Sequence, residues 1–195
     1  MTNFPAETET SLIAKAQAGD RSAFGELVRR HRAGVVNVAY RLCGDVQLAE
    51  DAAQEAFLRA WLKLTSYRPT SPLRNWLYRI AVNATLDALR RPAEAFLEDG
   101  DMAISAGAHR EVEADTLRRE QAEWVRKALL SLTPANRAVL VLREYEELSY
   151  REIAVALDIP VGTVMSRLNY ARNALRELLK METMPLETEY DRTRD

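Results

Sequence analysis

The chain has 195 residues, of which 47% are apolar and 29% charged, and this composition excludes a disordered chain and predicts one domain or two small ones. One cysteine excludes an intrachain disulfide framework, and two histidines are too few for an ordinary transition-metal site. The net charge is −2, no apolar run is long enough to span a membrane, and the N-terminus has no signal-peptide pattern, so we expect a cytosolic protein.

Apolar residues recur at helical spacing along most of the chain, which predicts helices throughout. Four helices are expected in the first half, and a polar loop over residues 65–71 precedes the last of them. They are a short helix around Leu12 that ends at Gly19, a helix with an apolar stripe from Phe24 to Leu42 that ends at Gly44, an alanine-rich helix over 46–64 that Asp45 can cap, and a helix over 72–91 that begins after Ser71 and stops at Arg91-Pro92.

The helical period is lost over residues 93–111, which are acidic and contain glycine, so we interpret this segment as a flexible acidic linker. After the period returns, Ser149 and Glu152 have the spacing of a capping box, and they precede a short helix. Asp158 lies in the tight turn that follows, where aspartate tolerates the left-handed conformation. A long helix from Val161 completes the pattern of a helix-turn-helix.

We therefore predict an all-α fold of two small helical domains joined by the linker. Their boundaries are a flexible N-terminus over 1–10, a first domain over 11–92, the linker over 93–111, a helix-turn-helix domain over 112–180 and an acidic tail over 181–195.

The two predicted domains are basic, whereas the segments between and after them are acidic. Residues 20–91 carry 12 basic and 7 acidic side chains, residues 124–180 carry 9 and 6, and residues 92–123 carry 3 and 9. A chain that is acidic overall argues against strong unaided DNA binding, because phosphate neutralisation supplies most non-specific affinity. Two locally basic domains still permit DNA contact, and a solvated protein with uneven charge is the alternative.

The second helix of a helix-turn-helix enters the major groove, where arginines reach phosphates or guanine edges and asparagine pairs with adenine. A helical hairpin without a DNA function is the alternative. The exposed candidates at the start of this helix are Thr163, Met165, Ser166, Arg167, Asn169, Tyr170 and Arg172.

Acidic side chains crowd one edge of the predicted helix over 46–64. Asp51 and Glu55 are four residues apart, so two like charges are stacked, at a cost of about 0.2–0.5 kcal/mol. An acidic edge that ends in apolar Leu58 suggests a docking surface for a basic partner, and a solvated face is the alternative. A metal or acid/base site is not indicated, because no histidine follows at suitable spacing.

Polar residues line the predicted helix over 72–91 opposite its apolar stripe, at Arg79, Asn83, Asp87 and Arg90. Aromatic residues and a polar loop lie nearby, a mixture that suits unstacked single-stranded bases. The alternative is a core tryptophan beside a solvated face, and we expect Trp76 to be mostly buried because it belongs to the apolar stripe.

Two ordered blocks of residues, which together cover about residues 11–180, carry a family resemblance. The first block consists of Asp-Ala-Ala-Gln-Glu-Ala-Phe at 51–57, Trp61, and Asn-Trp-Leu-Tyr-Arg-Ile-Ala at 75–81. The second consists of Leu132-Thr-Pro134, Arg137, Leu142-Arg143, Ser-Tyr-Arg-Glu-Ile-Ala at 149–154, and the residues Gly162-Thr163-Val164, Ser166-Arg167-Leu168 and Ala171-Arg172. The first block resembles region 2, and the second resembles region 4, of the bacterial extracytoplasmic-function (ECF) sigma factors.

This resemblance implies a promoter-specificity subunit that binds promoter DNA and core RNA polymerase. The elements of the polymerase that it would contact are the β′ clamp coiled coil and the β flap. It implies no cofactor and no catalytic residue, and an anti-sigma factor is a typical regulator in the family. The implied polymerase-binding residues are Asp51, Gln54, Glu55, Phe57 and Leu58. Those for the −10 element are Tyr67, Arg74, Asn75, Trp76, Arg79, Asn83, Arg90 and Arg91. Those for the −35 element are Arg151, Thr163, Met165, Ser166, Arg167, Asn169, Tyr170 and Arg172.

Two other classes of function remain open from the sequence. A stand-alone helix-turn-helix regulator would bind duplex DNA tightly as a dimer without polymerase. A helical enzyme or scaffold would need a ligand pocket, but the sequence offers no nucleophile–base pair, phosphate loop or metal-ligand spacing. Cys43 could be a redox sensor, although a lone thiol in a helix more often serves packing.

Overall fold

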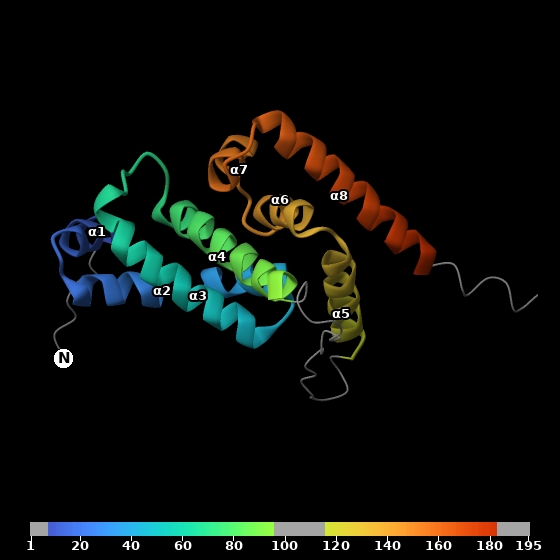
Figure 1. The fold of residues 1–195 in the computed structure, drawn as a ribbon, viewed down its shortest axis with the longest axis horizontal. Helices are drawn as coiled ribbons and strands as arrows, with labels where there is room; N and C mark the ends of the chain where they lie inside the picture. The colour runs from blue at the N-terminus through green and yellow to red at the C-terminus, as the bar shows by residue number, and fades with distance from the viewer. Residues whose placement is uncertain (1–7, 96–115, 183–195) are drawn as a thin grey trace, which may run out of the picture. The chain divides into compact units, whose positions relative to one another are not determined.

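The computed structural model describes residues 8–95 and 116–182, and all the long regular elements in these ranges are α-helices, with no strand. The chain divides into two compact units, in agreement with the predicted all-α class of two domains. The elements are α1 (Glu9–Gln17), α2 (Arg21–Cys43), α3 (Val46–Lys63), the short 3-10 helix η1 (Leu64–Ser66), α4 (Leu73–Ala95), α5 (Thr116–Ser131), α6 (Pro134–Glu144), α7 (Tyr150–Leu157) and α8 (Val161–Glu182) (Figure 1).

Local sequence determines where α2 and α3 begin and end. The carboxylate of Asp20 accepts hydrogen bonds from the backbone N–H groups of Ser22 and Ala23 and so caps α2. Gly44 ends α2 with a φ of 73°, a left-handed conformation that costs glycine little. Asp45 then caps α3, because its carboxylate accepts from the N–H of Leu48 at 2.7 Å. The predicted ends at Gly44 and Asp45 are confirmed.

The first unit is built around α3, which packs against both α2 and α4. Its buried side chains are all alanines, and small side chains allow neighbouring backbones to come close: Ala49, Ala52, Ala53, Ala56 and Ala60. Larger residues from the neighbouring helices fill the remaining space, each at most 3% exposed: Leu27, Val38 and Leu42 from α2, and Leu77 and Val82 from α4. The exposed side of α3 is therefore left for other contacts.

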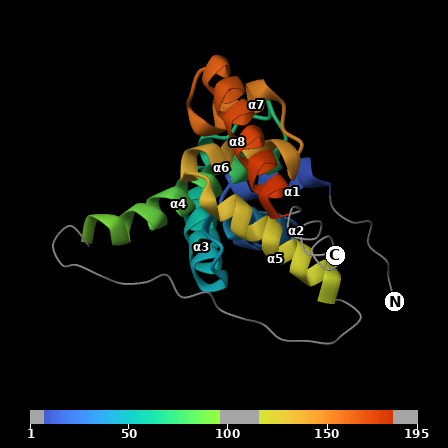
Figure 2. The ribbon, with the colours of Figure 1, turned by 90° about the vertical axis from the view of Figure 1, so that its right-hand side faces the viewer.

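In the second unit, α8 packs on α6, and α5 contacts both (Figures 1 and 2). Val164, Leu168 and Ala171 form the buried stripe of α8 at steps of four and three residues. The opposite side of the same helix is exposed and carries polar residues.

The helix-turn-helix forms through the predicted local contacts. Ser149 and Glu152 make the capping box, with the Ser149 N–H donating to the Glu152 carboxylate at 2.8 Å and the Glu152 N–H donating to Ser149 Oγ at 3.3 Å. Asp158 adopts a φ of 53° between α7 and α8, which confirms the predicted left-handed turn.

Several predicted boundaries differ from the structure, among them the end of α8, which runs to Glu182 and so into the predicted tail. α1 begins at Glu9, inside the segment predicted to be flexible, because the Thr8 side chain caps it through the N–H of Ser11. α4 continues to Ala95, since Pro92 removes one backbone donor but does not break a 23-residue helix that is anchored by its buried first turns. The alanine-rich helix ends at Lys63 and tightens into η1. Most of the predicted linker and tail lies outside the described residues.

Candidate nucleic-acid and docking interfaces

The exposed side of α3 carries polar residues toward its start and leucines toward its end. Asp51 and Gln54 are exposed, and Leu58 and Leu62 are 61% and 78% exposed. These four residues follow helical spacing, so they share one face, which we call the α3 docking face. Exposed leucines four residues apart suggest a contact surface for another macromolecule. Leu62 was missed in the sequence, although its position four residues after Leu58 and outside the alanine stripe was a usable signal.

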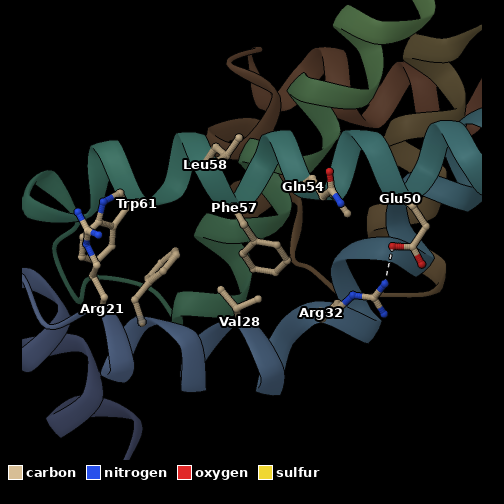
Figure 3. Close-up of a pocket in the computed structure, with 10 residues that line it drawn as sticks. Arg21, Val28, Arg32, Glu50, Gln54, Phe57, Leu58 and Trp61 are labelled. Carbon is tan, nitrogen blue, oxygen red and sulfur yellow. Dashed lines mark hydrogen bonds and ion pairs between the residues drawn. The ribbon is translucent and has the colours of Figure 1, made fainter.

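An apolar groove of about 480 Å³ lies between α2 and α3, beside this face (Figure 3). Phe57 and Val28 approach each other across it, so Phe57 lines the groove rather than the docking face. An ion pair of 2.6 Å between Arg32 and Glu50 spans one end. The other lining residues are Arg21, Phe24, Ala53, Gln54, Leu58 and Trp61.

The crowded acids of α3 are relieved by partners four residues away on the same helix, of which Arg59 was expected to offset part of the charge, and by one long-range ion pair that the sequence spacing did not show. Glu55 pairs with Arg59 at 2.7 Å, and Arg59 also pairs with Asp87 of α4 at 2.8 Å. The hydrogen bonds that Arg59 donates to the carboxylates of Asp87 and, to a lesser extent, Glu55 raise the pKa of Arg59. Asp51 accepts a hydrogen bond from Gln47 at 3.2 Å and remains exposed. Asp51 is therefore better placed than Glu55 to meet a basic partner.

The segment between α3 and α4, residues 64–72, is fixed by buried contacts. Tyr67 is 4% exposed; its hydroxyl donates to the Ser71 carbonyl at 2.7 Å, and its ring lies 5.2 Å from that of Trp76. Burial and the nearby Glu9 carboxylate raise the pKa of Tyr67. Tyr67 and the 7%-exposed Asn75 therefore cannot contact bases directly in this conformation, contrary to our expectation, because tertiary packing turns both side chains inward.

Other residues of this region are exposed. The tip of the 64–72 loop consists of Arg68, Pro69 and Thr70, all exposed. Trp76 is half-buried, as its ring packs on Tyr67. On α4 the exposed candidates are Arg74, Arg79, Asn83 and Arg90, and the side chain of Arg91 lies outside the described residues. Asp87 binds Arg90 at 3.2 Å as well as Arg59. The loop tip and the exposed residues of α4 thus present three further arginines and an amide beside Arg68.

The first three turns of α8 present a mixed surface. The exposed candidates are Met165, Ser166, Asn169, Tyr170 and Arg172, while Thr163 and Arg167 are half-buried; Arg151 is exposed on α7. Arg172 pairs with Glu144 of α6 at 2.6 Å, and the hydrogen bonds to Glu144 and then Tyr150 raise the pKa of Arg172. This helix face is thus rich in hydrogen-bonding and apolar groups but poor in cations.

Three further observations concern the described parts of the chain. There, no group of three histidine, cysteine or carboxylate side chains is arranged to hold a metal ion. None of the helices in these ranges has both the length and the apolar character needed to cross a membrane. Cys43 is half-buried, and its thiol donates to the carbonyl of Asp45 at 3.2 Å.

Known proteins match both units. The sequence profile of Sigma-70 region 2 matches residues 27–94, and that of Sigma-70 region 4 matches residues 122–175. The chain is 35% identical to the ECF RNA polymerase sigma factor SigW of Bacillus subtilis, over 86% of this chain and 95% of that protein. It is 38% identical to the ECF RNA polymerase sigma-E factor of Escherichia coli, over 86% and 92%. Among solved structures, the sigma factor RpoE of Bartonella quintana in complex with the anti-sigma factor NepR matches with a TM-score of 0.70 and 26% identity, over 82% of this chain and 98% of that one.

Proposed function

The chain belongs to the ECF family of RNA polymerase sigma factors, and we propose that its two units divide promoter recognition between them. The first unit docks on core RNA polymerase and opens the −10 element, and the second unit reads the −35 element. The observation that carries this assignment is the α3 docking face, where exposed leucines stand beside an exposed acid. A regulator that worked without polymerase would not need such a face.

For docking, Leu58 supplies an apolar anchor and Asp51 supplies a charge that a basic helix of the polymerase β′ subunit can meet. Gln54 lies between them and offers both a donor and an acceptor. Phe57 supports the docking face from the groove below it, and Glu55 is held by Arg59. Buried apolar anchors carry most of the affinity of such interfaces, whereas exposed charges mainly steer and orient the partner.

For the −10 element, the exposed tip of the 64–72 loop and the arginines of α4 are suited to one unpaired strand. Arg74 and Arg79 can follow its phosphates, Asn83 can bond a base edge, and Arg90 extends the basic path. Unpairing and extruding a base costs a few kcal/mol, which contacts to the captured base offset.

For the −35 element, the exposed start of α8 enters the major groove of duplex DNA. Ser166 and Asn169 can bond base edges, and Met165 and Tyr170 can contact thymine methyl groups or sugars. The residues proposed to contact the −35 element also include Arg151, Thr163, Arg167 and Arg172. This face has few cations, which agrees with a DNA-binding surface whose affinity for the −35 element depends on polymerase.

The chemistry of RNA synthesis belongs to the polymerase, so we assign no catalytic group to this chain and place its work in the cytosol. The Bartonella sigma factor forms a complex with an anti-sigma factor. We expect a protein of that class to inhibit this chain by covering the α3 docking face.

The assignment is tested with purified chain and core RNA polymerase. Leu58→Asp places a charge in the anchor of the α3 docking face, and we expect a loss of core affinity of about thirtyfold or more. Asp51→Arg reverses the exposed charge and should slow association. Val46→Asp is the matched control, since Val46 is 57% exposed on the same helix and outside the face.

Core affinity measured by biolayer interferometry and run-off transcription from the cognate promoter should fall together for Leu58→Asp and stay unchanged for Val46→Asp. Equal core binding by wild type and Leu58→Asp would show that docking occurs elsewhere. Selection of one operator from random duplexes by the chain alone, unaffected by polymerase, would support a stand-alone regulator.

A further inference from the structure

We propose that Gln17, the last residue of α1, is a positioning residue for the 64–72 loop and thereby for base capture in the −10 element. This inference rests on the proposed role of that loop. It adds a function for α1, which carries none of the residues assigned to polymerase or DNA.

The side-chain amide of Gln17 bridges two carbonyls from a distant part of the chain. Its Nε2 donates to the Leu64 carbonyl at 3.0 Å and to the Tyr67 carbonyl at 3.0 Å. An amide NH₂ group has two hydrogens, so one side chain satisfies both acceptors. The bonds span 47 and 50 residues of sequence, and α1 packs beside η1 (Figure 1).

The two carbonyls lie at the two ends of the 3-10 turn that leads into the loop. The Leu64 carbonyl also accepts from the Tyr67 N–H at 3.0 Å, which closes the turn. The Tyr67 carbonyl is the last one before the exposed tip, where Arg68 donates to it at 3.3 Å. Gln17 therefore fixes the orientation of the peptide that directs Arg68, Pro69 and Thr70 toward solvent.

The far end of the loop is fixed separately, by the bond from the Tyr67 hydroxyl to the Ser71 carbonyl. With both ends held, the tip is pre-organised before DNA arrives, and small misplacements of such groups have large effects on the step they serve. Gln17 itself is only half-buried, whereas the neighbouring Leu12 and Ala16 supply the buried apolar contacts of α1. Loss of the amide should thus loosen the loop without unfolding the unit.

The test uses full-length chain assembled with core polymerase. Gln17→Glu keeps the length of the side chain but replaces the donors with a carboxylate that repels both carbonyls. Gln17→Lys keeps a donor that can reach them. Asn37→Asp is the matched control, because it makes the same amide-to-acid change at an exposed position of α2. Arg68→Ala/Pro69→Gly changes the loop tip itself.

Three affinities are measured for each variant. Two are those of the holoenzyme, for a non-template −10 oligonucleotide and for a −35 duplex, and the third is that of the free chain for core polymerase. We expect Gln17→Glu to weaken oligonucleotide binding about tenfold, as loss of two hydrogen bonds would, and to leave the other two affinities within twofold. It should also slow opening of a promoter that carries 2-aminopurine in the −10 element. Gln17→Lys should restore most of the affinity, and Asn37→Asp should match wild type.

A uniform loss of all three affinities in Gln17→Glu, no loss at all, or a failure of Gln17→Lys to recover would overturn the positioning role. If Gln17→Glu is silent while the tip variant loses oligonucleotide binding, the loop reads the −10 element and only the Gln17 inference fails. If the tip variant binds the oligonucleotide like wild type, the proposed function of the loop fails, whatever Gln17→Glu does.

Discussion

At the level of single residues, Tyr67 holds the 64–72 loop through its hydroxyl and its ring at once. The hydroxyl donates to Ser71, and the ring packs on Trp76 in a site from which solvent is excluded. Burial disfavours the phenolate, which is why the pKa of Tyr67 lies above the ordinary value of 10.0. The contact is therefore available only while the hydroxyl keeps its proton.

Tyr67→Phe should lower the free energy of unfolding of the first unit by about 1 kcal/mol at pH 7, because it removes one hydrogen bond. Because the folded-state pKa is raised, this contribution is complete below the unfolded-state pKa near 10 and is lost as the pH rises through the folded-state value. Urea titrations of both proteins between pH 7 and 11 measure the difference, which should shrink only above pH 10. A difference that stays constant over this range would contradict the assignment.

Arg172 and Glu144 form an exposed ion pair between α8 and α6, with side chains 43% and 46% exposed. Such pairs contribute little to stability, so the pair matters mainly through the charge that it leaves on the proposed −35 surface. The negative charge of Glu144 partly cancels the positive charge of Arg172 and would also repel an approaching phosphate.

Glu144→Gln should therefore strengthen holoenzyme binding to a −35 duplex by a few fold, because Arg172 becomes available for a phosphate. The slope of log K against log salt should steepen by about 0.9, the value for one further phosphate contact. Arg172→Gln should have the opposite effect on both quantities. Fluorescence anisotropy at several salt concentrations measures them, with the exposed Glu147→Gln as the control. Unchanged slopes in both variants would place Arg172 away from the phosphates.

At the level of elements, the turn between α5 and α6 depends on one buried cation. The guanidinium of Arg137 donates to the carbonyls of Leu130 and Leu132, each at 2.8 Å, and the residue is 6% exposed. These carbonyls lie at the end of α5, where the helix leaves acceptors without intrahelical donors. Arg137, which belongs to the residues that resemble region 4, is thus structural rather than DNA-binding.

Arg137→Met should lower the free energy of unfolding of the second unit by about 2–3 kcal/mol, because one buried and one partly buried carbonyl lose a charged donor. Arg137→Lys keeps a donor and should cost less. Hydrogen exchange resolved by segment should show faster exchange in α5 and α6 and unchanged exchange in α2 to α4. The exposed Arg151→Met should leave all segments unaffected, and equal effects of Arg137→Met on both units would refute a local role.

At the level of the whole molecule, charge and surface chemistry both limit unaided DNA binding. The net charge is −2, and the proposed DNA-reading face of α8 has few cations that are not paired or half-buried. Neutralisation of DNA phosphates by basic side chains supplies most of the affinity of a free DNA-binding protein. The free chain therefore lacks the main source of affinity for DNA. Docking on polymerase adds affinity for promoter DNA and holds both units of the chain at one promoter. This raises the effective concentration of each unit at its promoter element.

The free chain at 150 mM salt should bind its promoter duplex no more than about tenfold more tightly than a random duplex, well below the 10³-fold or more of independent regulators. Added core polymerase should strongly raise this preference for the promoter duplex over the random duplex. Leu58→Asp should abolish the increase without changing the weak DNA binding of the free chain. Electrophoretic mobility shifts with and without core measure both, and core alone is the control. High selectivity of the free chain would refute the dependence on polymerase.

The sequence by itself determined the helical class, the order of the helices and several of their ends. Gly44, Asp45, the capping box at Ser149 and the turn at Asp158 were predictable because each depends on residues within four positions along the chain. The α3 edge was found for the same reason, since helical spacing places Asp51, Gln54 and Leu58 on one side.

Only the tertiary structure decided which side chains face inward and which distant groups they meet. Tyr67 and Asn75 were expected at a DNA surface, yet both are buried, because the packing of the 64–72 loop determines their orientation. Gln17 reaches carbonyls 47 and 50 residues away, and Arg172 reaches Glu144 28 residues away. Such bonds depend on how whole helices pack against one another, and a local pattern of residues carries no information about that packing.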